Sequence, residues 1–270
     1  MNFNWTLLGA SAAALLIASA AGFAEEHEED ELEFDEAHIF FELNNTDGDL
    51  GIHALIDGDP WKKLQIKDER ENKLLSINVR SRLRRQGLTE LFFESAEPPF
   101  DELSPGEFFD RFPAGTYEVE GVSLEGDAIE GGTEITHAMP APPMPTVNGE
   151  PFATICDDED PEYNVTEVSD ANGIVIAWPA VTATHPDPRF PQEFGDDYDF
   201  VIYNYEVVVE VEVGDDEFPS VLSVILPPGE TSMTIPAEFI AQGDEFKYEV
   251  LARESSFNQT ATESCFVLAD

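Results

Sequence analysis

Short stretches in which apolar and polar side chains alternate recur along most of the chain. In residues 37–45, Ile39, Phe41 and Leu43 share one parity, so on a β-strand they would face one side of a sheet. Comparable stretches, bounded by Gly and Pro, occur at 50–58, 61–67, 73–83, 88–95, 115–125 and 131–137. Strands of this length and spacing are typical of a β-sandwich. We therefore predict an all-β fold, with a turn at Gly58-Asp59-Pro60 between two of the strands.

One short helix is predicted near residue 105. Ser104 can cap its first turn, Pro105 suits the first helical position, and Glu107 completes a capping box. A proline-rich segment, AMPAPPMPTVNGEP at 138–151, favours extended linker geometry. We predict two β-sandwich domains in tandem, at 37–137 and 156–270, with a linker at 138–155 and one short helix in the first domain.

The N-terminus has the composition of an export signal. Residues 7–24 are apolar and small, and Gly22 and Ala24 provide a cleavage site, which predicts a secretory signal peptide over 1–24. The alternative is a membrane anchor, but the stretch is rich in Ala, Gly and Ser, and a span needs about 20 strongly apolar residues. Residues 25–36 hold nine acids in twelve positions and are predicted to form a disordered arm. We expect a secreted or periplasmic protein with no membrane insertion after cleavage.

The second domain, over residues 160–268, resembles a fibronectin type III domain. The resemblance rests on IVIAWP at 174–179 with its core Trp178, on YEVVV at 205–209, and on the segments 231–236 and 243–250. Phe246 stands where the family usually places a corner tyrosine, which puts that hydroxyl-to-backbone bond in doubt. The resemblance implies a non-catalytic role in adhesion, spacing or recognition, and the fold by itself selects none of these.

The chain has two cysteines, Cys156 and Cys265. An even count in an exported chain indicates a disulfide, and two buried free thiols are the alternative. The first and last strands of the fold that the second domain resembles run close together, which would bring the two cysteines within bonding range.

The net charge restricts the partners of the chain. Its 57 acidic and 13 basic residues give a formal charge of −44, so nucleic acids and anionic bilayers would be repelled. A protein or an acidic polysaccharide remains as the expected partner. No nucleophile elbow, P-loop or zinc-binding helix motif occurs in the sequence. We predict that the chain is not an enzyme; a hydrolase using carboxylates that no spacing singles out is the weaker alternative.

No cofactor is predicted, and calcium is the one metal that the sequence suggests. Asn45, Asp47 and Asp49 have the spacing of the first ligands of an EF-hand loop. The pattern then fails, because Leu50 and Ile56 occupy the positions of the loop glycine and of the bidentate glutamate. Asp and Gly in two tight turns explain the same residues.

Basic residues are concentrated in one window of this acidic chain. Nine of the 13 lie in 62–85, and strand alternation would place a subset of them on one outer face. That predicted basic face consists of Lys63, Lys67, Arg80, Arg82 and Arg84. It would pair with Glu90, Glu94 or Glu118 across strands, dock the acidic arm, or bind an anionic partner. The last alternative includes the acidic second domain of another copy, and therefore self-association.

Overall fold

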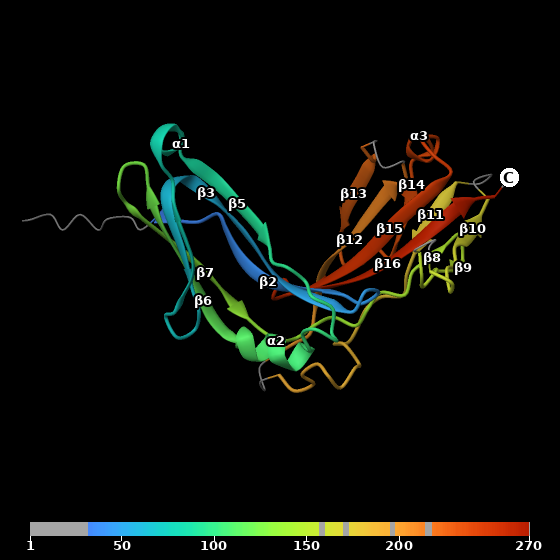
Figure 1. Ribbon diagram of the computed structural model, residues 1–270, viewed down its shortest axis with the longest axis horizontal. Coiled ribbons are helices and arrows are strands. Elements are labelled where there is room, and N and C mark those ends of the chain that lie inside the picture. Colours follow the sequence, from blue (N-terminus) through green and yellow to red (C-terminus); the bar gives the residue numbers. More distant parts are fainter. Residues whose placement is uncertain (1–31, 157–159, 170–172, 195–197, 214–217, 270) are drawn as a thin grey trace, which may run out of the picture. The chain divides into compact units, whose positions relative to one another are not determined.

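The computed structural model describes residues 32–156, 160–169, 173–194, 198–213 and 218–269 (Figure 1). Most of these residues lie in β-strands, so the all-β fold class is confirmed. The strands form a twelve-stranded sheet with the path β1-β7-β6-β3-β2-β16-β15-β12-β13, and a four-stranded sheet, β14-β11-β8-β9. The predicted signal peptide and the first part of the acidic arm lie outside the described residues. No helix of the described part is long and apolar enough to span a membrane.

The first half of the chain contains seven strands and two helices. These are β1 (Leu32–Glu33), β2 (Glu36–Asn44), β3 (Asp49–Lys67), β4 (Lys73–Asn78), α1 (Ser81–Gln86), β5 (Leu88–Glu94), α2 (Pro105–Arg111), β6 (Gly115–Ser123) and β7 (Ala128–Ile135). The last residues of the acidic arm thus belong to strands. The arm was predicted to be disordered from residue 25 to residue 36. Instead, residues 32–33 form β1, which pairs in parallel with β7, and residue 36 begins β2.

β3 is one continuous strand of 19 residues, so the predicted turn at Gly58-Asp59-Pro60 is wrong. Residues 49–57 of β3 pair with β2 and β5, and residues 61–67 pair with β4 and β6. Residues 58–60 fall at a shift of register within the β3–β5 ladder. Pro60 therefore costs the sheet no hydrogen bond, and the strand continues through it.

The predicted alternation and the predicted helix of the first half are confirmed. Ile39, Phe41 and Leu43 are fully buried in one hydrophobic core. Helix α2 begins with the expected capping box, in which the Ser104 side chain accepts from the Glu107 backbone N–H. Phe108 and Phe109 of α2 then pack edge-on against the Phe41 ring.

A tyrosine corner lies just after α2. The buried Tyr117 hydroxyl donates to the backbone carbonyl of Pro113, four residues upstream, at 3.0 Å. This is the hydroxyl-to-backbone bond of tyrosine corners, and burial raises the pKa of Tyr117 to about 12. Phe246, at the position where the second half was expected to lack such a bond, is a fully buried core residue stacked on Phe266.

The second half is a sandwich around its own core. Its elements are β8 (Thr146–Val147), β9 (Glu150–Pro151), β10 (Thr166–Val168), β11 (Ile174–Ala177), β12 (Ile202–Val211), β13 (Val221–Leu226), β14 (Ser232–Ile235), α3 (Ala237–Ile240), β15 (Glu245–Glu254) and β16 (Gln259–Leu268). Trp178 packs edge-on against Tyr205, with ring centroids 5.3 Å apart. The core that these rings share includes residues from both sheets.

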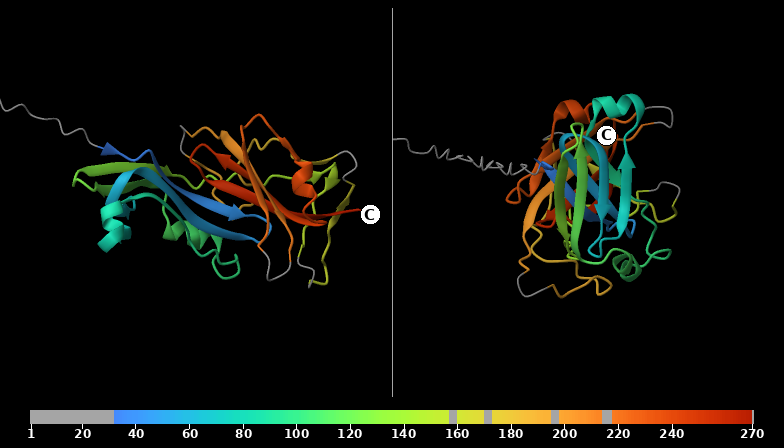
Figure 2. Two further views of the ribbon diagram at one scale, coloured as in Figure 1. Left: turned by 90° about the horizontal axis from the view of Figure 1, so that it is seen from above. Right: turned by 90° about the vertical axis from the view of Figure 1, so that its left-hand side faces the viewer.

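The two halves share one sheet. β16 runs parallel to β2, with residues 259–261 opposite 42–44 (Figure 2). The proline-rich segment is held against β16 by buried side chains. The Thr260 and Thr262 hydroxyls donate to the carbonyls of Pro140 and Pro143 at 2.8 and 2.7 Å. The segment expected to act as a linker is therefore fastened along its first part, and it contains β8 and β9.

Candidate functional site

Two of the predicted binding residues, Arg82 and Arg84, lie on a helix instead of a strand, and Arg80 is the N-cap residue of that helix. The stretch 73–83 was predicted to be one strand with its arginines on the outer side, but β4 ends at Asn78 and α1 follows. The reason is a break at Ser81, whose φ of 56° is left-handed and cannot continue a strand. Arg, Leu and Gln then favour a helical turn, and Gly87, with a φ of 81°, ends it.

Helix α1 buries none of its side chains. Leu83, which strand alternation would place in the core, is 50% exposed. We call Arg80, Arg82, Arg84 and Arg85 the basic protrusion; all four are exposed. Among the described residues, none of these arginines forms an ion pair. The expected pairing of the arginines with Glu90, Glu94 or Glu118 is therefore not seen in the described part of the chain.

The two lysines of the predicted basic face behave differently from each other. Lys67 is surrounded by carboxylates, with its Nζ 3.2 Å from Glu71, 3.9 Å from Glu118 and 2.5 Å from Glu120. These partners raise the pKa of Lys67 through hydrogen bonds to Glu120 and Glu71. Lys63 is exposed at the end of the β3–β4 ladder, opposite Asn78. Lys67 thus has an internal role, whereas Lys63 remains available beside the strand that leads into α1.

Two of the three predicted calcium ligands, Asn45 and Asp47, have side-chain partners within the chain. The Asn45 carboxamide contacts His185 Nε2 at 3.1 Å, while Asp47 accepts a hydrogen bond from the Asn44 side chain at 3.2 Å. The same Asn44 side chain accepts from the backbone N–H groups of Thr46 and Asp47, which makes 44–47 a side-chain-closed turn. Within the described part of the chain, no group of three acidic, His or Cys side chains is arranged to hold a metal.

Carboxylates gather instead where β3, β2, β16 and β15 adjoin. We call Glu42, Asp49, Glu97, Glu249 and Glu263 the junction carboxylates. Burial, together with the charges of its neighbours, raises the pKa of Glu249 to about 8 and that of Asp49 to about 7. Burial is also the first cause of the raised pKa values of Glu42 and Glu263.

His53 is a buried histidine beside these carboxylates, and it can carry a positive charge when protonated. Its Nε2 lies 2.8 Å from Glu97 and its Nδ1 lies 3.7 Å from Glu42. Burial alone would lower the pKa of His53, but the hydrogen bond to Glu97 and the charge of Glu42 outweigh burial and raise it. Gly51 makes room for this arrangement, because a Cβ there would lie 1.9 Å from a Glu97 oxygen. A glycine inside a strand pattern indicates that another group approaches the backbone closely. Gly51 was the one feature of the sequence that pointed to this cluster.

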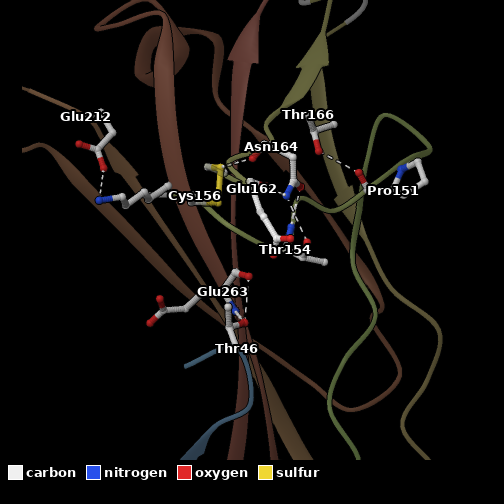
Figure 3. Close-up of a disulfide and its surroundings, with 11 residues drawn as sticks. Thr46, Pro151, Thr154, Cys156, Glu162, Asn164, Thr166, Glu212 and Glu263 are labelled. Atoms are coloured by element: carbon white, nitrogen blue, oxygen red, sulfur yellow. Dashed lines mark hydrogen bonds and ion pairs between the residues drawn. A yellow bond between two sulfur atoms is a disulfide. The ribbon is translucent and has the colours of Figure 1, made fainter. Parts of the chain in front are cut away.

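The predicted disulfide is confirmed. Cys156 and Cys265 are bonded with their Cα atoms 5.8 Å apart, and the bond lies beside the Asn164 loop (Figure 3). Asn164 holds that loop together by accepting from the Thr154 backbone N–H at 2.9 Å and donating to the Glu162 carbonyl at 3.2 Å. The bond joins the start of the second half to its last strand, β16.

Among the comparisons with known proteins, only the search of solved structures found matches. No protein-family model matches the chain, and no curated protein matches it. The FN1-FN3 domains of chicken CNTN1 match with a TM-score of 0.31 and 10% identity, over 89% of this chain and 65% of that one. A 1.5-MDa bacterial ice-binding adhesin matches with a TM-score of 0.24 and 13% identity, over 88% and 65%. The tetra-tandem repeat of a large adhesion protein matches with a TM-score of 0.25 and 11% identity, over 86% and 49%. The chain covers less than two thirds of each of these structures, and its function is inferred below from its own contacts.

Proposed function

We propose that this chain is an exported, non-catalytic binding module that holds an anionic polymer, such as an acidic polysaccharide, through the basic protrusion. The observation that carries the proposal is the exposure of four arginines without an ion-pair partner in the described part of a chain of charge −44. Lys67, by contrast, lies within 3.9 Å of three carboxylates, so its positive charge is neutralised within the chain. The positive charge of the basic protrusion is not neutralised by the described residues and is therefore available to bind an anionic partner.

The local geometry supports a role outside folding. α1 buries no side chain, and the left-handed backbone of Ser81 costs on the order of 1 kcal/mol. Within α1, Arg82 and Arg85 are neighbours at i and i+3, with Cβ atoms about 5–6 Å apart, and Arg80 precedes the helix as its N-cap residue. This pair of guanidinium groups can hold a carboxylate or sulfate of a repeating polymer, and Arg80 and Arg84 add positive charge beside it.

The second half is proposed to be a fibronectin type III-like sandwich that supports this module. Its two facing sheets, the Trp178–Tyr205 contact and the core position of Phe246 support that assignment. The Cys156–Cys265 disulfide supports export, since such bonds persist in oxidising compartments.

The test replaces Arg80, Arg82, Arg84 and Arg85 together by Gln and measures binding to immobilised alginate at 50 mM and 500 mM salt. The expected result is a loss of at least tenfold at 50 mM and a smaller loss at 500 mM, because salt screens the lost attraction. The melting temperature should be nearly unchanged, since exposed substitutions usually alter stability by about 0.5 kcal/mol or less each.

Arg111→Gln removes another exposed arginine and should leave binding unchanged. Lys67→Gln should lower stability and not binding. Equal alginate binding by the wild type and the fourfold variant would contradict the proposal. Binding to poly-L-glutamate but not to alginate would make the partner an acidic protein.

A further inference from the structure

β13 forms one open edge of the twelve-stranded sheet, and none of its own residues is of a kind that usually prevents edge pairing. It pairs with β12 and with no other strand of the described part. Its sequence, VLSVIL, contains no charge, proline or glycine, whereas every other strand of that sheet has at least one charged residue. Edge strands of soluble proteins usually have charges, prolines or bulges that prevent pairing with another chain.

The backbone groups that β13 leaves free can be identified from its register. The Val211 N–H donates to the Ser220 carbonyl at 3.0 Å, so these two residues form a hydrogen-bonded pair. Such pairs alternate along an antiparallel ladder, and the even-numbered residues of β13 therefore bond to β12. Val221, Ser223 and Ile225 direct their N–H and C=O groups to the open edge. Val221 and Ile225 are also 55% and 60% exposed.

We propose that β13 pairs antiparallel with β13 of a second copy, about a two-fold axis at Ser223. In this register Ser223 lies opposite its own counterpart, and Val221 lies opposite the counterpart of Ile225. All three residues then form hydrogen-bonded pairs, and their apolar side chains meet on one face. Centring the axis on Val224 would set Val221 against a proline, which has no N–H to donate.

β13 carries no charge, so two acidic copies can meet at this strand. Each copy carries −44, so two copies can approach only where their surfaces are neutral or screened. Glu206 and Glu210 lie on β12, the neighbour of β13. In the dimer, β12 of one copy would be three strand spacings from β12 of the other, so the backbones at these glutamates would be about 14 Å from those of their counterparts. That distance exceeds the Debye length of about 8 Å at physiological salt. The contact involves fewer residues than the roughly 20–30 per partner of stable interfaces, so the fraction of dimer should depend on protein concentration. Because salt screens the repulsion between the two acidic copies, the dimer should also become more stable as salt rises.

The first experiment is cross-linking of Ser223→Cys in the full chain under mild oxidation at 0.5 M salt. Hydrogen-bonded pairs place Cα atoms about 5.5 Å apart, within disulfide range. Ser232→Cys is the matched control, because Ser232 is an exposed serine on β14, the edge of the other sheet. The expected result is dimer formation at least tenfold faster for Ser223→Cys, with a rate that falls at low salt.

The second experiment is sedimentation of variants that disable the edge. Ser223→Pro removes an N–H that β12 does not use, and Ile225→Lys adds a charge; both variants should remain monomeric where the wild type dimerises. Alginate binding should be unchanged in both, so failure of the dimer is distinguishable from failure of the basic protrusion. Equal cross-linking of the two cysteine variants would overturn self-pairing. A wild type that stays monomeric while Ser223→Cys cross-links to other extracellular proteins would also overturn it, and would assign the edge to a foreign strand.

Discussion

Glu249 lies on β15, on the same face as Glu206 and Glu263, with Glu42 of β2 nearby. Burial and these like charges raise its pKa to about 8. A carboxyl group whose pKa is raised on folding binds its proton more tightly in the native state than in the unfolded chain. Between about pH 4.5 and pH 8, this group therefore reduces the free energy of unfolding as pH rises. Asp49, with a pKa of about 7, acts in the same direction.

We predict that Glu249→Gln stabilises the protein by about 1–3 kcal/mol at pH 8.5, because the variant removes a charge that the fold disfavours. The gain should nearly disappear near pH 4.5, where the wild-type carboxyl is protonated in the native state and about half protonated in the unfolded chain. Chemical denaturation at the two pH values measures the difference. Glu245→Gln, on the exposed start of the same strand, should have little effect at either pH. An equal gain at both pH values would rule out this explanation.

β3 and the two helices of the first half illustrate how an element depends on its surroundings. The parity of Leu64 and Ile66 was predictable, and both are buried. The continuity of β3 through Pro60 was not, because it depends on a change of partner strands at that point. α2 was predictable because its capping box is local. α1 was not, because one left-handed residue, Ser81, decides it.

We predict that Ser104→Ala lowers the free energy of unfolding by about 1 kcal/mol, since the first turn of α2 loses its side-chain cap. The loss should appear in urea denaturation with an unchanged m-value. Ser232→Ala, an exposed serine in a strand, is the control and should be nearly neutral. A neutral Ser104→Ala would mean that α2 is held by its phenylalanines alone.

At the scale of the whole molecule, Asn258 joins the two halves. It is fully buried, and its side chain accepts from the Phe41 N–H at 2.9 Å and donates to the Thr136 and Ala138 carbonyls at 2.9 and 3.3 Å. These bonds connect β2, the end of the first half and the residue that precedes β16. Each buried group left without a partner would cost about 1–3 kcal/mol.

We predict that the wild type unfolds in one thermal transition and that Asn258→Ala lowers its midpoint and separates it into two. Differential scanning calorimetry measures both effects. Asn164→Ala removes three hydrogen bonds, all of which lie within the second half. This control should lower the midpoint without creating a second transition. A single transition in Asn258→Ala would show that the β2–β16 ladder couples the halves without it.

Sequence alone determined the features that depend on near neighbours along the chain or on composition. Period-two alternation identified the strands and the buried faces of β2 and of the second part of β3, the capping box located α2, and two cysteines in a chain expected to be exported indicated the disulfide. Tertiary structure decided what depends on contacts between distant segments. It placed the arginines on and just before α1, paired Lys67 internally, and brought Glu42, Glu249 and Glu263 together across three strands. It also joined both halves in one sheet and left β13 unpaired at its edge. Local patterns specify how a strand or turn is built, but the choice of partner strand is set by the packing of the whole chain.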